Sequence, residues 1–89
     1  MGSRLLRIIG EINYDSFSAF SEQLAELEGL SSAPVQVELC SEGGTDYAGL
    51  AFWGRIRNSP CRIEICAIGA VQSAATLVFA AGDYRMAVR

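Results

Sequence analysis

The sequence contains no histidine and no lysine. Those two side chains most often take the proton from a nucleophilic serine, so no group of the usual kind is present to activate one. The seven positive charges are all arginines, stand against ten carboxylates for a net charge of −3, and are scattered along the chain. This distribution excludes the basic footprint of a nucleic-acid-binding protein.

Cysteine is scarce as well, and its arrangement follows no metal-binding pattern. The three cysteines, Cys40, Cys61 and Cys66, are an odd number, and their spacing matches no zinc motif. We predict that they are reduced thiols in the core of the protein. This favours a cytoplasmic protein without a metal or cofactor.

Long hydrophobic segments are absent apart from one uncharged run over residues 65–82. At about 18 residues it reaches the lower limit for a transmembrane helix. The run contains Gln72 and Thr76, and its first half continues an alternating pattern that begins at Cys61. A buried strand, a tight turn and a buried helix explain it without a bilayer, so we expect no membrane association. Residues 5–9 are too short and too charged to be a signal peptide.

What the sequence has instead is a regular alternation of strand-like and helix-like patterns. With 89 residues, 51% of them hydrophobic, it is expected to form one partial domain over residues 1–89, with residues 1–3 as a cloning remnant. The predicted strands are Leu5–Ile9 (extending toward Ile12), Val35–Leu39, Cys61–Ile68 and Tyr84–Val88. The predicted helices run from a cap at Asn13 or Asp15 to Gly29, from Thr45 or Asp46 to about Asn58, and over Ser73–Ala81. This order predicts an α/β fold with a mostly parallel sheet and crossover helices.

The second predicted helix is apolar on two sides. One side carries Tyr47 and Leu50, and the opposite side carries Phe52, Trp53 and Ile56. A helix of this kind is usually covered by two layers. We therefore expect Phe52, Trp53 or Ile56 to be buried against a second copy of the chain, in a homo-oligomer.

Two predicted strand-to-helix junctions carry unusual residues: Ser41–Gly44 (SEGG) and Gly69–Ala74 (GAVQSA). Paired glycines let backbone N–H groups approach an anion, and a serine at a helix start is a candidate nucleophile. Taken singly, each has a simpler explanation: a tight turn for Gly43-Gly44 and a helix N-cap for Ser73. Because the carboxyl ends of neighbouring parallel strands lie at one edge of a sheet, the two junctions together favour an acyl-transfer site.

From about Ile8 to Met86 the sequence resembles the proteolytic subunit of Clp protease, and especially the Clp-like phage head-maturation proteases of the same ClpP/crotonase superfamily. The matching segments are, in order, Gly10–Ile12, Ser41–Gly44, Ala48–Ala51, Gly69 with Ser73, Ala80–Asp83 and Arg85–Ala87. No single segment is specific to the family, but their order and spacing together are.

The resemblance implies a role for three residues. Ser73 matches the nucleophile, and the backbone N–H groups of Gly44 and Ala74 match the oxyanion hole. It also implies the superhelical ClpP/crotonase fold, ring-shaped homo-oligomers, and peptides or unfolded proteins as substrates.

The sequence departs from the family at the catalytic base. In the family a histidine follows the strand after the nucleophile helix and an aspartate comes later, so both positions fall beyond Arg89. Glu42 stands where the family has proline or another uncharged residue, and a carboxylate there opposes the charge of an oxyanion.

The first hypothesis is therefore the amino-terminal part of a ClpP-like serine peptidase, truncated after the nucleophile helix and the following strand, and inactive as it stands. One alternative is a pseudo-enzyme that serves as an oligomerisation or peptide-binding module. The other is a crotonase-like protein that binds acyl-thioesters through the same N–H groups.

Overall fold

The computed structural model describes residues 3–87. Strands and helices alternate in the order β1 (Leu5–Ile9), α1 (Tyr14–Leu30), β2 (Val35–Ser41), α2 (Asp46–Arg57), β3 (Ile63–Val71), α3 (Ala74–Ala81) and β4 (Tyr84–Ala87). The strands pair in the order β1-β2-β3-β4, and every pair is parallel. The predicted α/β class with a parallel sheet and crossover helices is confirmed. The last predicted strand ended at Val88, which lies outside the described residues.

Hydrogen-bonding side chains fix the starts of the first two helices. Asn13 caps α1: its Oδ1 accepts the N–H of Ser16 at 2.8 Å, and Ser16 Oγ accepts the N–H of Asn13 at 3.0 Å. Thr45 caps α2, where its Oγ1 accepts the N–H of Ala48 at 3.3 Å. These hydrogen bonds satisfy N–H groups at the helix starts that have no partner within the helix. In both helices the cap is the first of the two residues that the sequence offered.

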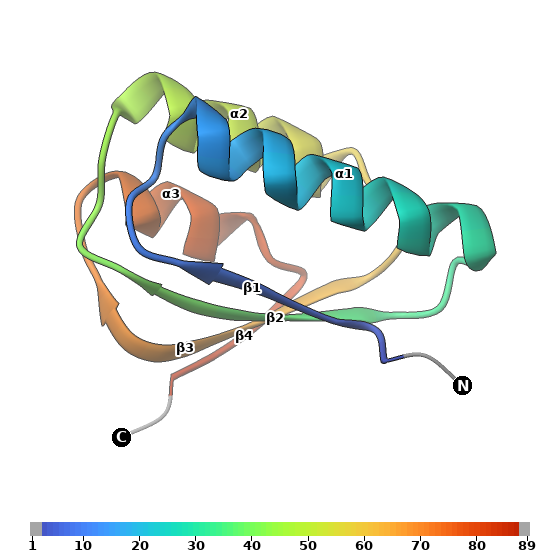
Figure 1. The fold of residues 1–89 in the computed structure, drawn as a ribbon. Coiled ribbons are helices and arrows are strands. Elements are labelled where there is room, and N and C mark those ends of the chain that lie inside the picture. Colours follow the sequence, from blue (N-terminus) through green and yellow to red (C-terminus); the bar gives the residue numbers. More distant parts are fainter. Residues whose placement is uncertain (1–2, 88–89) are drawn as a thin grey trace.

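All three helices lie on one face of the sheet (Figure 1). Along β1, β2 and β3 buried residues alternate with more exposed ones, as expected for strands that are covered on one side. Phe52 of α2 is fully buried at the centre of this layer, with its ring centroid 5.4 Å from those of both Phe17 and Phe20 of α1. Ile56, one turn further along α2, belongs to the same core.

The expectation that Phe52 or Ile56 is covered by a second copy of the chain is therefore wrong. Their own chain buries both side chains, because α1 packs on that side of α2. The side of α2 left in solvent carries Tyr47, which is 77% exposed, and Leu50, which is 52% exposed. Trp53, which was predicted to lie with Phe52 and Ile56, is 37% exposed and is not part of the core. Helical periodicity showed two apolar sides correctly but did not indicate which of them faces the core.

An ion pair with two further hydroxyl contacts joins α1 to α2. Arg55 donates to both carboxylate oxygens of Glu28, at 2.8 and 2.6 Å, and its Nε donates to Ser21 Oγ at 3.1 Å. Ser59 Oγ donates to the same carboxylate at 2.6 Å and accepts the N–H of Cys61 at 3.2 Å. The hydrogen bonds from Arg55 lower the pKa of Glu28 below its ordinary value. This group holds the two helices together at the end away from the Ser41–Gly44 junction.

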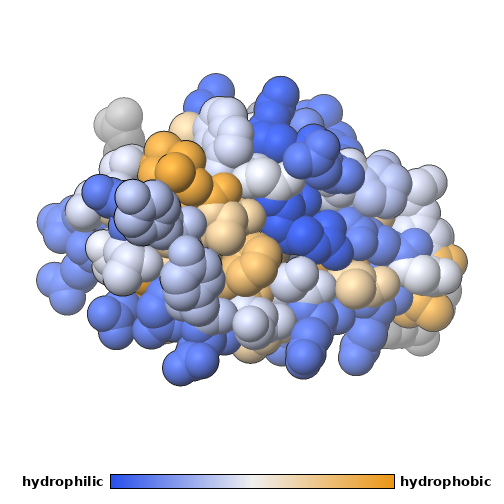
Figure 2. All heavy atoms as spheres, turned by 90° about the horizontal axis from the view of Figure 1, so that it is seen from above, coloured by the Kyte–Doolittle hydropathy of each residue, from blue (hydrophilic) through white to orange (hydrophobic). Residues whose placement is uncertain are grey.

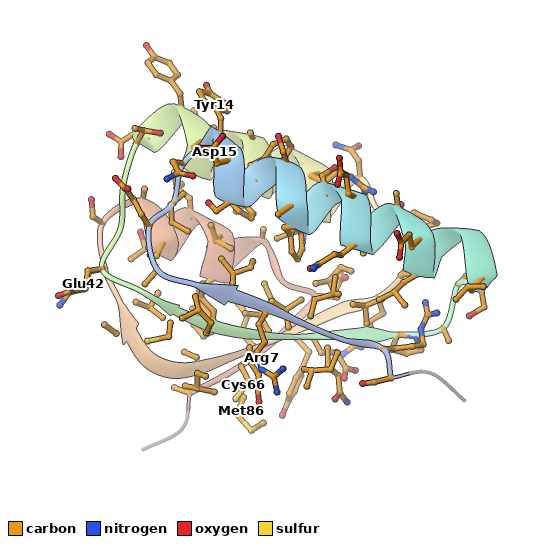
Figure 3. The ribbon with its side chains drawn as sticks, in the orientation of Figure 1. Arg7, Tyr14, Asp15, Glu42, Cys66 and Met86 are labelled. Atoms are coloured by element: carbon orange, nitrogen blue, oxygen red, sulfur yellow. The ribbon has the colours of Figure 1, made fainter. Side chains whose placement is uncertain are left out.

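The other face of the sheet carries two of the three cysteines. All three thiols are free, but only Cys61 is buried, whereas Cys40 and Cys66 are half-buried. Figure 3 shows Cys66 on the side of the sheet away from the helices, near Arg7 and Met86. The prediction of core thiols is correct for Cys61 and wrong for the other two, because nothing in the described part of the chain covers that face.

The uncharged run over residues 65–82 divides between β3, a turn and α3. Within residues 3–87, no helix is both long enough and apolar enough to cross a bilayer.

Candidate active site

The two junctions singled out in the sequence meet at the carboxyl ends of β2 and β3. These strands are parallel neighbours, and the N–H of Gln72 donates to the carbonyl oxygen of Ser41 at 3.1 Å. A Cβ atom built on Gly43 would lie 2.8 Å from the Cβ of Ser73. The predicted adjacency of the two strands, and of the Gly43-Gly44 turn with Ser73, is confirmed.

Both strands run further than their apolar patterns predicted, to Ser41 and Val71. Leu39 pairs with Ala67, and Ser41 pairs with Val71. A step of two residues along β2 therefore lies opposite a step of four residues along β3. The additional residues of β3 form a bulge, and a bulge bends its strand and changes the direction of the residues that follow. The turn that leads to Ser73 therefore leaves the sheet at an angle that a regular strand would not give.

Ser73 has a backbone conformation that serine rarely adopts. Its φ is 52° and its ψ is −127°, and it is the one non-glycine residue with positive φ in the described part of the chain. Although Ser73 stands at the N-cap position of α3, its hydroxyl makes no capping hydrogen bond. The simple N-cap explanation of Ser73 is thus wrong. A sharp strand-to-helix turn with a strained, exposed serine is the geometry that presents a nucleophile.

Gly44 turns its N–H group toward the same place. The N–H of Ile12 donates to the carbonyl of Gly43 at 2.9 Å, and the N–H of Thr45 donates to the carbonyl of Ile12 at 2.9 Å. The Gly43 carbonyl and the Gly44 N–H belong to one planar trans peptide group, in which the C=O and N–H bonds point in opposite directions. The N–H of Gly44 therefore points away from Ile12, toward the side on which β3 and Ser73 lie.

Ala74 supplies a second N–H group of the same kind. It is the first residue of α3, where N–H groups have no partner within the helix. The next two residues are satisfied, since Ala75 donates to Gln72 and Thr76 donates to Ser73, at 3.0 and 2.9 Å. Neither Gly44 nor Ala74 has an acceptor for its N–H among residues 3–87. Two unpaired donors beside an exposed hydroxyl can bind an oxyanion.

Small residues allow the two junctions to approach so closely. A side chain on Gly44 would collide with the backbone carbonyl of Ile12, and Gly43 has a φ of 113°. A Cβ on Gly49 of α2 would lie 3.0 Å from the carbonyl oxygen of Ala74. The glycines are therefore required by close backbone contacts, and not only by the turn.

Among residues 3–87, no carboxylate forms a hydrogen bond with Ser73. Asp83 accepts the N–H of Ile63 at 2.8 Å, at the start of β3, whereas Ser73 follows the end of that strand. A strand of this length spans roughly 25 Å, so Asp83 lies at the opposite edge of the sheet. Asp46 is exposed at the start of α2 and makes no hydrogen bond with Ser73.

Glu42 is exposed to solvent on the loop between β2 and α2 (Figure 3). It lines a groove of about 530 Å³ together with Glu11, Cys40 and Gly43-Gly44, and Ser73 is not part of that lining. Solvent screens a carboxylate in this position, which weakens its effect on a charge at Ser73. Glu42 is therefore a smaller obstacle to oxyanion binding than its sequence position indicated.

Sequence reasoning missed Ser41. It was noted as part of the SEGG segment but was given no role, although the structure buries it and places it in contact with both junctions. The available signal was a serine two residues before a glycine at the end of a strand, a pattern in which the hydroxyl often binds the backbone.

Comparison with known proteins gives the family of this chain. The Clp protease family model matches residues 1–89. The chain is 39% identical, over 80 residues, to ATP-dependent Clp protease proteolytic subunit 2 of Borreliella burgdorferi, covering 89% of this chain and 40% of that protein.

Solved structures agree with this comparison. ClpP1 from Listeria monocytogenes superposes with a TM-score of 0.87 at 30% identity, over 89% of this chain and 46% of that one. The ClpP protease catalytic domain from Plasmodium falciparum, at 22% identity, shares the fold with a TM-score of 0.86, over 94% of this chain and 54% of its own. The chain thus spans about half the length of these relatives or less. Because the family model extends over the whole sequence, and relatives of 30–39% identity match 89% of it, the chain belongs to the Clp protease family.

Proposed function

We propose that the chain carries the nucleophile and the oxyanion hole of a Clp-type serine peptidase. Ser73 is the nucleophile, and the N–H groups of Gly44 and Ala74 bind the oxyanion. The observation that carries the proposal is the strained turn at Ser73, with φ of 52°, packed against the Gly43-Gly44 turn. A strained residue is retained where the surrounding structure holds it, and such residues cluster at active sites.

In the proposed reaction the Oγ of Ser73 attacks the carbonyl carbon of a peptide bond. As the new C–O bond forms, the carbonyl π electrons move to the oxygen, which accepts hydrogen bonds from Gly44 and Ala74. The hydroxyl proton passes to a base and then to the leaving amine, whose bond to carbon breaks. Because the sequence has no histidine or lysine, the base must come from outside these 89 residues, and the chain alone is inactive.

The expected result with this chain alone is no reaction at Ser73. A fluorophosphonate probe should leave the 89-residue chain unlabelled, because an unactivated serine hydroxyl is a poor nucleophile. A longer version in which a histidine follows β4 should be labelled at Ser73 and should cleave peptides. Intact-protein mass spectrometry and peptide mapping measure both results.

Matched variants of the longer chain make the test specific. Ser73→Ala should abolish labelling, whereas Ser59→Ala, at the far end of the helices, should leave it within about twofold, as expected for a distant site. Labelling of the short chain at Ser73, or labelling of the longer chain that survives Ser73→Ala, would refute the assignment.

A second candidate function, a homo-oligomeric or peptide-binding module, is favoured by the outer side of α2. An exposed apolar stripe on that side consists of Tyr47, Leu50 and Trp53. The Arg57 guanidinium lies 5.8 Å from the centroid of the Trp53 ring. Figure 2 shows hydrophobic atoms reaching the surface among the mostly hydrophilic side chains of the helical face. We propose that this stripe packs against a second copy of the chain, in the cytoplasm, where its free thiols remain reduced.

Charge placed in this stripe should dissociate the assembly. Leu50→Glu should convert an oligomer into a monomer in sedimentation-velocity experiments, because an unpaired carboxylate would be buried at the contact. Leu30→Glu is the matched control, since Leu30 is 78% exposed at the carboxyl end of α1 and outside the stripe. A monomeric parent chain, or equal dissociation by both variants, would count against this surface. The crotonase-like alternative has no observation in its favour beyond the two shared N–H groups.

A further inference from the structure

Ser41 is the one buried polar side chain among residues 3–87, with 2% of its surface exposed. It is the last residue of β2 and directly precedes Glu42 and the paired glycines. A hydroxyl that is removed from water costs stability unless it forms hydrogen bonds inside the protein. The bonds that Ser41 forms therefore show what its burial achieves.

Within the described residues, the hydroxyl of Ser41 binds only Gly43, in the turn that leads to Gly44. Its Oγ accepts the N–H of Gly43 at 3.0 Å and donates to the carbonyl oxygen of Gly43 in a longer contact of 3.4 Å. That carbonyl oxygen also accepts the N–H of Ile12 at 2.9 Å. Both sides of Gly43 are thus held, and this fixes the direction in which the following peptide N–H, that of Gly44, points.

The backbone of Ser41 binds the other junction. Its carbonyl oxygen accepts the N–H of Gln72 at 3.1 Å, one residue before Ser73. Ser41 also pairs with Val71 beyond the bulge in β3. One residue therefore contacts the turn that carries the first oxyanion donor and the turn that carries the nucleophile and the second donor.

Small movements of Gly43 would be transmitted to Ser73. A Cβ on Gly43 would lie 2.8 Å from the Cβ of Ser73, 3.0 Å from the carbonyl oxygen of Gln72 and 3.4 Å from the nitrogen of Ala74. Without the Ser41 hydroxyl, the N–H of Gly43 has no acceptor, and the turn is held on one side only, by the bond from Ile12 N–H to the Gly43 carbonyl. The spacing between the two oxyanion donors would then be less tightly constrained.

We propose that Ser41 is a positioning residue for the oxyanion hole: its hydroxyl sets the orientation of the Gly44 N–H relative to Ser73 and Ala74. The catalytic value of this role rests on the proposed peptidase function. The orientation of the Gly44 N–H, however, is present in the folded chain whether or not any reaction occurs. It is therefore tested on the 89-residue chain by a structural measurement, whose outcome is independent of Ser73 labelling.

The test compares Ser41→Ala with Ser59→Ala by amide NMR spectroscopy and hydrogen exchange. Ser59 is a close match, because its Oγ also accepts the N–H two residues later, at 3.2 Å to Cys61. In Ser41→Ala the Gly43 amide should exchange about 3- to 10-fold faster, as expected from the loss of one hydrogen bond. The amide resonances of Gly44 and Ala74 should shift as well. In Ser59→Ala these three amides should keep their shifts, and any faster exchange should follow the global stability alone.

A second variant of Ser41 keeps the hydroxyl group. Ser41→Thr keeps the acceptor and should restore the Gly43 protection and the Gly44 and Ala74 shifts toward those of the parent chain. If Ser41→Ala leaves all three amides unchanged, or if Ser59→Ala changes them equally, Ser41 has no positioning role. A failure of Ser73 to become labelled in a longer chain would instead remove the peptidase proposal and leave these amide results standing.

Discussion

Gly44→Ala is expected to destabilise the chain by about 3 kcal/mol, through two lost hydrogen bonds and a backbone displacement. The new Cβ would collide with the carbonyl group of Ile12, and a backbone atom cannot move aside as a flexible side chain can. The segment around Ile12 would have to separate from the Gly43–Thr45 segment. That movement breaks the bonds from Ile12 N–H to Gly43 and from Thr45 N–H to Ile12, both 2.9 Å long.

Urea denaturation followed by circular dichroism measures this effect, and another glycine of the chain offers a control of opposite sign. Gly54 lies within α2, and a Cβ built there has no atom within 4 Å. Gly54→Ala should therefore stabilise the chain, by up to about 1 kcal/mol, because alanine is the better helix former. A Gly44→Ala chain within about 0.5 kcal/mol of the parent, a margin typical of harmless surface changes, would show that the close contact with Ile12 is not present in solution.

Phe52→Ala is expected to have an equally large effect, a loss of about 3–5 kcal/mol. Phe52 is fully buried, and its ring contacts those of Phe17 and Phe20 at centroid distances of 5.4 Å. Removing it leaves a cavity between α1 and α2 and also removes two aromatic pairs. A domain of this size has a total stability at the low end of about 5–15 kcal/mol, so much of the population should unfold near 37 °C.

The measurement is the urea midpoint together with the near-ultraviolet circular dichroism signal of the aromatic core. Phe52→Leu, which keeps most of the apolar volume, should lose only about 1 kcal/mol. Equal losses for the two variants would mean that the ring contacts, and not the filled volume, stabilise this region. A Phe52→Ala chain as stable as the parent would contradict the packing of α2 against α1.

The sequence by itself determined the order of the elements, their parallel pairing and the place of the candidate site. The alternation of period-two and period-3.6 patterns predicted every strand and helix, because each element must bury one face. The same pattern brought the junctions Ser41–Gly44 and Gly69–Ala74 together, since the carboxyl ends of adjacent parallel strands share an edge.

Only the tertiary structure decided which faces are covered. Phe52 and Tyr47 lie on opposite sides of one apolar helix, and only the position of α1 shows that the first is buried and the second exposed. The same holds for Cys40 and Cys66, whose strands are covered on one face in the described part of the chain. A periodic pattern gives the angle between side chains on one element, and the direction of the core depends on the elements packed around it.

The tertiary structure also decided the geometry at Ser73 and the role of Ser41. The positive φ of Ser73 has no local signal in its sequence, because serine alone does not favour that conformation. It arises from the bulge that carries β3 on to Val71 and from the Gly43 turn packed against it. Residue patterns thus determined which groups meet. Contacts between segments about thirty residues apart determined how those groups are oriented, because such contacts outweigh local backbone preference.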